Sequence, residues 1–302
     1  MKTFKRLIKN PLSLTGLVII LCFIGVAIAA PWLAPPQKPH EPYRVPRDWL
    51  LYNKFSSTPR LPQPDAFSQF PPNWRKHPFG TSAEQYDIYY GIVWGTRTAF
   101  RSGIIVVSST LLIGILLGAL SGYYGGWLDQ LIMRLVDIFL AFPGLIAALV
   151  LVSILGNGLN QVLIALIAFG WPGYARLVRG DILSIREREY VQAAKALGAR
   201  DVRVIFRHVL PNVIYPVLIV ASLDIGSVVL QVSALSFLGL GAEVGYADWG
   251  QMISFARNWL KDLDIYWHTV VYPGLAILLF VLGWNLLGDA FRDILDPRLR
   301  GH

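Results

Sequence analysis

Three polar residues interrupt an otherwise apolar stretch and are the first candidates for chemistry. Asp224, Ser227 and Gln231 occur at positions i, i+3 and i+7, which places them on one face of a helix. An ionisable group at membrane depth costs several kcal/mol unless it is paired or in contact with water. The stripe therefore predicts either a polar path through the membrane or an interhelical hydrogen bond that fixes helix packing.

Sequence patterns of membrane-embedded and ATP-hydrolysing enzymes do not occur in the chain. It contains no HExxH, no GxxxxGK[ST] and no second aspartate at the expected depth of Asp224. The five histidines are scattered, and the single cysteine, Cys22, lies in an apolar run as a small lipid-facing or helix-facing residue. We therefore expect no catalytic residue, no metal site and no cofactor bound by this chain.

A second candidate is the charged segment EYVQAAKALGARDVRVIFRHVLPN, residues 189–212. Its pattern predicts two short helices separated by Gly198, a residue that often ends a helix in the left-handed conformation. Pro211 is expected to end the second helix. Apolar stripes at helical spacing comprise Tyr190, Ala193, Ala194 and Leu197 in the first helix, and Val202, Ile205, Phe206 and Val209 in the second.

The charges of this segment leave two interpretations open. Arg200, Arg203 and Arg207 fall opposite the second stripe, towards solvent or lipid headgroups. Small paired alanines inside a charged frame are typical of a surface on which another protein docks closely. The same pattern also fits an amphipathic loop that lies on the membrane surface.

Composition places these candidates in a membrane protein. The 302 residues are 54% hydrophobic and 15% charged, whereas soluble domains carry about a quarter charged residues. The net charge of +8 is better explained by the basic cytoplasmic loops of a membrane protein than by nucleic-acid binding. The fold class is therefore predicted to be an all-α polytopic membrane protein.

Six apolar runs are long enough to cross a bilayer, which takes about 20 residues. They lie near 12–30, 103–123, 134–155, 159–178, 213–238 and 269–287. The first run is longer than the apolar core of a signal peptide, so we interpret it as a retained anchor, although the Ala27-Ile28-Ala29 sequence also fits a cleavage site. Thr110, Gly114, Gly118 and Gly122 in the second run predict close helix packing, and Arg134 and Asp137 in the third can pair.

Lys and Arg outside the long first loop fall mostly on one side of the predicted topology. By the positive-inside rule, both termini and the charged segment are predicted to be cytoplasmic. The first loop contains 12 of the 19 prolines together with Trp32, Trp49 and Trp74. Such a composition favours an ordered irregular segment, which could cap the outer mouth, contact an external partner or pack on its neighbours.

Several motifs resemble those of the bacterial dipeptide, oligopeptide and nickel ABC-importer permeases. Gln192, Ala193, Ala194 and Gly198, followed by Leu210 and Pro211, resemble the EAA loop of that family. Further resemblances are HPFGT at 77–81, GYYGGWLDQLIMRLVDIFLAFP at 122–143, LSFLGLG at 235–241, DWG at 248–250 and RDILDPRLR at 292–300. The sequence is most similar to the C-type permease subunit, with Gln192 in place of the usual Glu and Val232 where an acidic residue is expected.

This resemblance implies a type I importer transmembrane domain that forms half of a translocation path for di- or oligopeptides. The implied partners are a second homologous permease, two cytoplasmic ATPase subunits that use ATP and Mg, and an extracytoplasmic solute-binding protein, in the inner membrane. Residues that would couple to the ATPase are Tyr190, Gln192, Ala193, Ala194, Leu197, Gly198, Arg200, Leu210 and Pro211. Asp224, Ser227 and Gln231 would then line the path and offer hydrogen bonds to peptide backbone.

The expected organisation is a tail and first helix at 1–31, a Pro-rich external loop at 32–98, and a five-helix core at 99–290. The core includes a coupling loop at 179–211, and a cytoplasmic tail follows at 291–302. Alternatives that stay open are nickel chelates or oligosaccharides as substrates. A secondary transporter driven by an ion gradient is an alternative from another class, although no internal repeat supports it.

Overall fold

The computed structural model describes residues 10–47, 58–68 and 76–295. Regular secondary structure within these ranges is helical, with only isolated β-bridges beside it. Five helices are long and apolar enough to cross a membrane. They are α2 (Pro11–Leu33), α3 (Ile88–Tyr124), α6 (Leu159–Ile185), α9 (Leu210–Phe237) and α12 (His268–Leu295).

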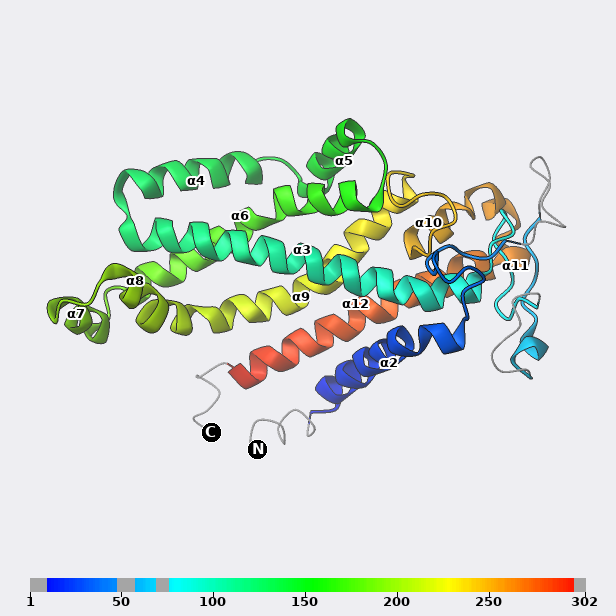
Figure 1. Ribbon diagram of the computed structural model, residues 1–302, viewed down its shortest axis with the longest axis horizontal. Helices are drawn as coiled ribbons and strands as arrows, with labels where there is room; N and C mark the ends of the chain where they lie inside the picture. The colour runs from blue at the N-terminus through cyan, green and yellow to red at the C-terminus, as the bar shows by residue number, and fades with distance from the viewer. Residues whose placement is uncertain (1–9, 48–57, 69–75, 296–302) are drawn as a thin grey trace.

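The third predicted span is a bent pair of helices. Helix α4 (Gly126–Leu140) and helix α5 (Gly144–Leu155) meet at 84° across a short break. The single run predicted at 134–155 is therefore wrong in its start and in its continuity. Pro143 lies in the break, where its missing N–H cannot continue the helical hydrogen bonds. With the bent pair counted as one span, the six-span architecture is confirmed (Figure 1).

Helix α3 starts well before the predicted run at 103–123. The Asp87 carboxylate accepts a hydrogen bond of 2.8 Å from the Tyr90 amide and thereby caps the new start. Residues 88–98, which the sequence placed in the external loop, are helical. Polar Thr96 and Arg97 keep this first part below the hydropathy of a span. At 37 residues, α3 is about 55 Å long and exceeds the bilayer core.

Helices α3 and α6 pack closely along the predicted glycine stripe. A Cβ atom added at Gly118 would lie 2.6 Å from the Ala175 carbonyl oxygen, and one at Gly114 would lie 2.3 Å from the Tyr174 Cβ. The stripe thus lets the two backbones approach to a distance that only glycine permits. The predicted packing role of these small residues is confirmed.

Helices α2 and α12 form a second pair beside α3 (Figure 1). The Phe23 and Phe280 rings meet edge to face at 5.3 Å. Gly16, near the start of α2, lies against Leu286 towards the end of α12. The two helices are therefore antiparallel, and the first part of α2 lies against the last part of α12.

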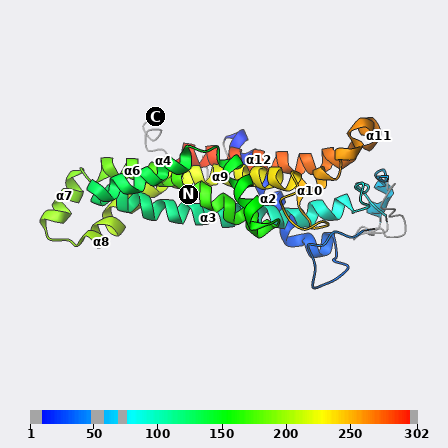
Figure 2. The same cartoon turned by 90° about the horizontal axis from the view of Figure 1, so that it is seen from above.

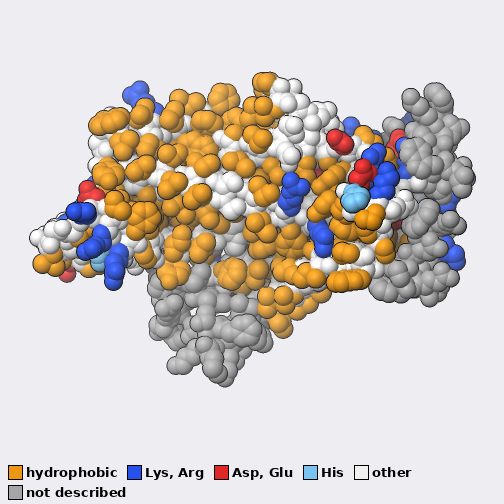
Figure 3. Space-filling view, in the orientation of Figure 1, with side chains coloured by type: hydrophobic (Ala, Val, Ile, Leu, Met, Phe, Trp, Pro, Cys, Tyr) orange, Lys and Arg blue, Asp and Glu red, His pale blue; other side chains and the backbone are white. Residues whose placement is uncertain are grey.

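The molecule is elongated, with different structures at its two ends (Figure 2). Helices α7 (Glu189–Ala196) and α8 (Asp201–Val204) project at one end. The opposite end holds the described parts of the Pro-rich segment, including η1 (Pro64–Ser68), together with α10 (Trp249–Ser254), η3 (Arg257–Asp262) and α11 (Leu263–Tyr266). Figure 3 shows hydrophobic side chains over the body between them, and Lys and Arg gathered near the α7 end.

The described Pro-rich residues are ordered by contacts to the loop after α9. The Val45 amide donates to the Gly245 carbonyl and the Ala247 amide donates to the Tyr43 carbonyl, each at 2.8 Å. The Tyr43 and Tyr246 rings stack at 5.3 Å. The expectation of an ordered irregular segment holds for these residues, whereas Trp49 and Trp74 lie outside the described ranges.

Candidate functional site

The first arm of the charged hairpin ends as its sequence predicts. Helix α7 stops at Ala196, and Gly198 adopts a φ of +81°. The Ala199 amide donates to the Ala194 carbonyl at 3.1 Å, and the Gly198 amide donates to the Lys195 carbonyl at 2.9 Å. This pair of bonds is a Schellman motif. Gly198 is needed here because a side chain strains the left-handed conformation.

The sequence predicted that the second arm ends at Pro211, and this prediction is wrong. Helix α8 passes through a π-helical turn, η2 (Ile205–Val209), directly into α9. The Leu210 amide donates to the Ile205 carbonyl across this wider turn. Pro211 follows in the first turn of α9, where its lack of an N–H is tolerated. The hairpin is therefore a direct extension of the membrane helix α9.

The hairpin buries one set of apolar side chains and exposes another. Val191, Val204 and Val209 are fully buried against the body of the protein. The predicted stripe on α7 instead faces outward, with Leu197 89% exposed. The predicted second stripe is split: its Ile205 and Val209 are buried. The outward-facing large apolar side chains are Tyr190, Leu197, Val202 and Phe206.

Arginines surround the outward face of the second arm. Arg200, Arg203 and Arg207 line a shallow groove together with Val202 and Phe206. All three arginines are exposed, as predicted, but they share a groove with Val202 and Phe206, so their predicted position opposite the whole stripe is wrong. Figure 3 shows Lys and Arg side chains gathered at the hairpin end of the visible face. The hairpin thus presents apolar side chains within a positive frame.

Gln192 ties the hairpin to the end of α6. Its Nε2 donates to the Arg186 carbonyl at 2.9 Å, and the Arg186 Nη1 donates to the Gly122 carbonyl of α3 at 3.0 Å. A glutamate at position 192 has no N–H to donate to this carbonyl. The departure from the family pattern at this position therefore has a structural role in this chain.

Ion pairs join α4 to α6 next to the hairpin. Arg179 donates to both carboxylate oxygens of Asp129, at 2.5 and 2.6 Å. Asp137 pairs with Arg176 of α6. The predicted pairing of Asp137 with Arg134 on its own helix is therefore wrong, because the bend in the third span brings α4 against α6.

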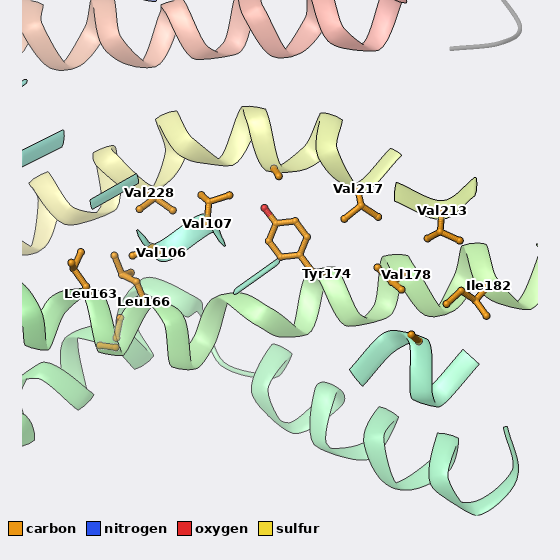
Figure 4. Packing of buried hydrophobic residues seen from close by; sticks show 14 of the residues in the cluster. Val106, Val107, Leu163, Leu166, Tyr174, Val178, Ile182, Val213, Val217 and Val228 are labelled. Atoms are coloured by element: carbon orange, nitrogen blue, oxygen red, sulfur yellow. The ribbon is translucent and has the colours of Figure 1, made fainter. Parts of the chain in front are cut away.

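The polar stripe on α9 has a partner that sequence reasoning missed. The Tyr174 hydroxyl donates to Asp224 Oδ2 at 2.5 Å, and Figure 4 shows Tyr174 pointing from α6 towards α9. Asp224 and Gln231 are half-buried, whereas Ser227 is exposed. Tyr174 belongs to no recognisable motif. Only one feature of the sequence indicated this partner, a tyrosine hydroxyl within a predicted span. The described residues contain no group of three or more metal-ligating side chains.

Comparisons with known proteins agree with this architecture. Residues 114–301 match the family described as binding-protein-dependent transport system inner membrane component. Residues 2–54 match the N-terminal transmembrane domain of oligopeptide transport permease C.

Individual relatives match nearly the whole chain. It is 40% identical over 299 residues to the dipeptide transport system permease protein DppC of Alkalihalophilus pseudofirmus, covering 99% of this chain and 90% of that one. It is 34% identical to the glutathione transport system permease protein GsiD of Pectobacterium atrosepticum, covering 98% and 90%. An inward-facing structure of the MetNI methionine ABC transporter, 19% identical, shares the fold with a TM-score of 0.54 over 68% of this chain and 96% of the other.

Proposed function

We propose how this chain, which belongs to the family of binding-protein-dependent transport system inner membrane components, works as an importer permease. It forms one half of a translocation path, and its hairpin is the surface on which a cytoplasmic ATPase docks. A second permease completes the path, and an external solute-binding protein delivers the substrate. ATP and Mg are used by the ATPase subunits, and this chain is not itself an enzyme.

The observation that carries this proposal is the exposed apolar set on the hairpin. A leucine that is 89% exposed gains nothing from the fold of its own chain, yet the Schellman motif and Gln192 hold its surroundings in place. A partner groove that covers Leu197 and Tyr190 would remove this apolar surface from water. The hairpin charges keep the surface soluble before docking.

Dipeptides or short oligopeptides are the proposed substrates. The support is the similarity to a dipeptide permease and to glutathione permeases, whose names indicate short peptides. Asp224, Ser227 and Gln231 would offer hydrogen bonds to such backbones along the path. We place the chain in the inner membrane, with the hairpin and both termini on the cytoplasmic side.

The test is ATP-driven uptake by a reconstituted complex of this chain with its candidate partner subunits. Proteoliposomes holding ATP on the ATPase side should take up labelled dipeptide, and vanadate should stop the uptake. Leu197→Asp should reduce copurification of the ATPase by about tenfold or more, because a carboxylate would replace the apolar contact. Since Leu197 has no role in folding this chain, the variant should remain folded.

Leu260→Asp is the matched control. Leu260 is also exposed, at 56%, but lies in η3 at the opposite end of the molecule. This variant should retain the ATPase. Uptake that needs only an ion gradient, or ATPase binding that survives Leu197→Asp, would overturn the proposal.

A further inference from the structure

Tyr123, in the last turn of α3, contacts both arms of the hairpin. Its hydroxyl donates to Asp201 Oδ1 at 2.6 Å, and Asp201 is the first residue of α8. The Lys195 Nζ, in the last turn of α7, lies 4.6 Å from the centre of the Tyr123 ring. Tyr123 is only 6% exposed. One buried side chain of α3 is thus held from two sides by the projecting element.

Both contacts depend on geometry as well as on proximity. The bond to Asp201 is a short charge-assisted hydrogen bond, which is stronger and more directional than a neutral one. The Lys195 contact is a cation–π interaction, which weakens when the cation leaves the ring face. A displacement of the hairpin must therefore either carry Tyr123 with it or break these contacts.

The helix end that holds Tyr123 is fixed to its neighbours. The Arg186 Nη1 donates to the Gly122 carbonyl, one residue before Tyr123. Ser121 Oγ donates to Asp129 Oδ1 at 2.5 Å, and Asp129 is itself paired with Arg179. The ends of α3, α4 and α6 therefore form one connected block, so that a force on Tyr123 acts on all three helices.

We infer that Tyr123, Asp201 and Lys195 form the joint through which hairpin movement is transmitted to α3. This inference rests on the proposed function, in which the ATPase moves the hairpin. Helix α3 is 37 residues long and runs without a break from Tyr123 to the opposite end of the molecule. A tilt imposed at Tyr123 reaches the outer mouth of the path through that single rigid element. Tyr123 is a positioning residue and touches neither ATP nor substrate.

Removal of the Tyr123 hydroxyl tests the joint. The complete complex carrying Tyr123→Phe is reconstituted, and ATP hydrolysis and dipeptide uptake are measured in the same proteoliposomes. The number of dipeptides imported per ATP hydrolysed should fall by about tenfold, because the charge-assisted bond is lost. The ATPase should still copurify with the complex, since the outward face of the hairpin is unchanged.

Asp201→Asn should act in the same direction, and the double variant should be no worse than the more severe single variant, because both changes remove one contact. Tyr124→Phe is the matched control: Tyr124 is adjacent but 51% exposed, and its transport ratio should equal that of the wild type. Asp201 is exposed, so Asp201→Asn should not disturb folding. If Tyr123→Phe fails to assemble, the ratio of imported dipeptide to hydrolysed ATP in Asp201→Asn tests the joint.

The outcomes separate the joint from the proposed function. A wild-type ratio in Tyr123→Phe and Asp201→Asn, with ATP-driven uptake intact, would overturn the joint alone. A wild-type complex that binds no ATPase would overturn the proposed function itself. Effects of Tyr123→Phe and Asp201→Asn that simply add would also contradict a shared contact.

Discussion

At the scale of single residues, Asp224 is the acidic group of the polar stripe on α9, and the proposed function gives it a place along the path. Its carboxylate accepts a hydrogen bond from Tyr174, which joins α9 to α6. This contact gives the carboxylate a packing role. However, a carboxylate has more acceptor sites than one hydroxyl can occupy. The remaining sites are available to a solute if the stripe lines the path.

Asp224→Asn separates these two roles. The asparagine oxygen can still accept from Tyr174, so the α6–α9 contact and the thermal stability should be nearly unchanged. If the carboxylate faces the path, dipeptide uptake should fall by about tenfold, because a charge-assisted bond to the solute is lost. The measurement is uptake by proteoliposomes at saturating ATP.

Asp264→Asn provides the control for Asp224→Asn, since Asp264 is an exposed aspartate in α11. It should transport at the wild-type rate. Uptake by Asp224→Asn that equals this control would show that the stripe serves packing only.

The predictions for single residues were correct where the contacts involve only residues that are neighbours in the sequence. The end of α7 at Gly198 followed from glycine and its neighbours, because a Schellman motif needs only adjacent residues. The partners of Asp137 and Asp224 could not be found in this way. Arg176 and Tyr174 lie on another helix, and only the three-dimensional packing brings them within reach.

At the scale of elements, the small residues of α3 predicted close helix packing, and the structure identifies α6 as the partner helix. Gly118→Ala should lower stability by about 1–3 kcal/mol, because the new methyl group meets the Ala175 carbonyl and the backbones must move apart. The measurement is the midpoint of thermal unfolding of the purified protein in detergent.

Gly180→Ala is the control for this contact. Gly180 also lies in α6, but nothing is within 4 Å of an added Cβ, so the change should be neutral or should stabilise the helix by up to about 1 kcal/mol. Equal midpoints for the two variants would show that the glycine stripe does not set the helix separation.

Element boundaries were predicted less well than element identity. The six apolar runs were recognisable because burial in lipid demands length and hydropathy. The start of α3 was missed because its first part carries polar side chains such as Thr96 and Arg97, which lower its hydropathy. The 84° bend was missed because the mean hydropathy of a segment does not report the angle between its two helices, here α4 and α5. Pro143 was visible in the sequence, but proline alone does not set the angle of a break.

At the scale of the whole molecule, α7 and α8 lie at one end, and the start of α2 and the end of α12 point towards that end. Residues of the Pro-rich segment and the loop after α9 lie at the other (Figures 1 and 2). The Lys and Arg distribution predicts that the hairpin end is cytoplasmic. The proposed function requires this orientation, because it places a cytoplasmic ATPase on the hairpin.

Single cysteines at the two ends determine the orientation. In a Cys22→Ser background, which removes the only native thiol, Leu197→Cys and Val244→Cys introduce reporters at exposed sites, 89% and 67% exposed. The variants are expressed without the ATPase subunits, which would cover Leu197. A membrane-impermeant maleimide applied to intact spheroplasts should then label Val244→Cys and should label Leu197→Cys only after the membrane is opened. The Cys22→Ser parent should remain unlabelled in both conditions. Labelling of Leu197→Cys in intact spheroplasts would place the hairpin outside, where no cytoplasmic ATPase could bind it.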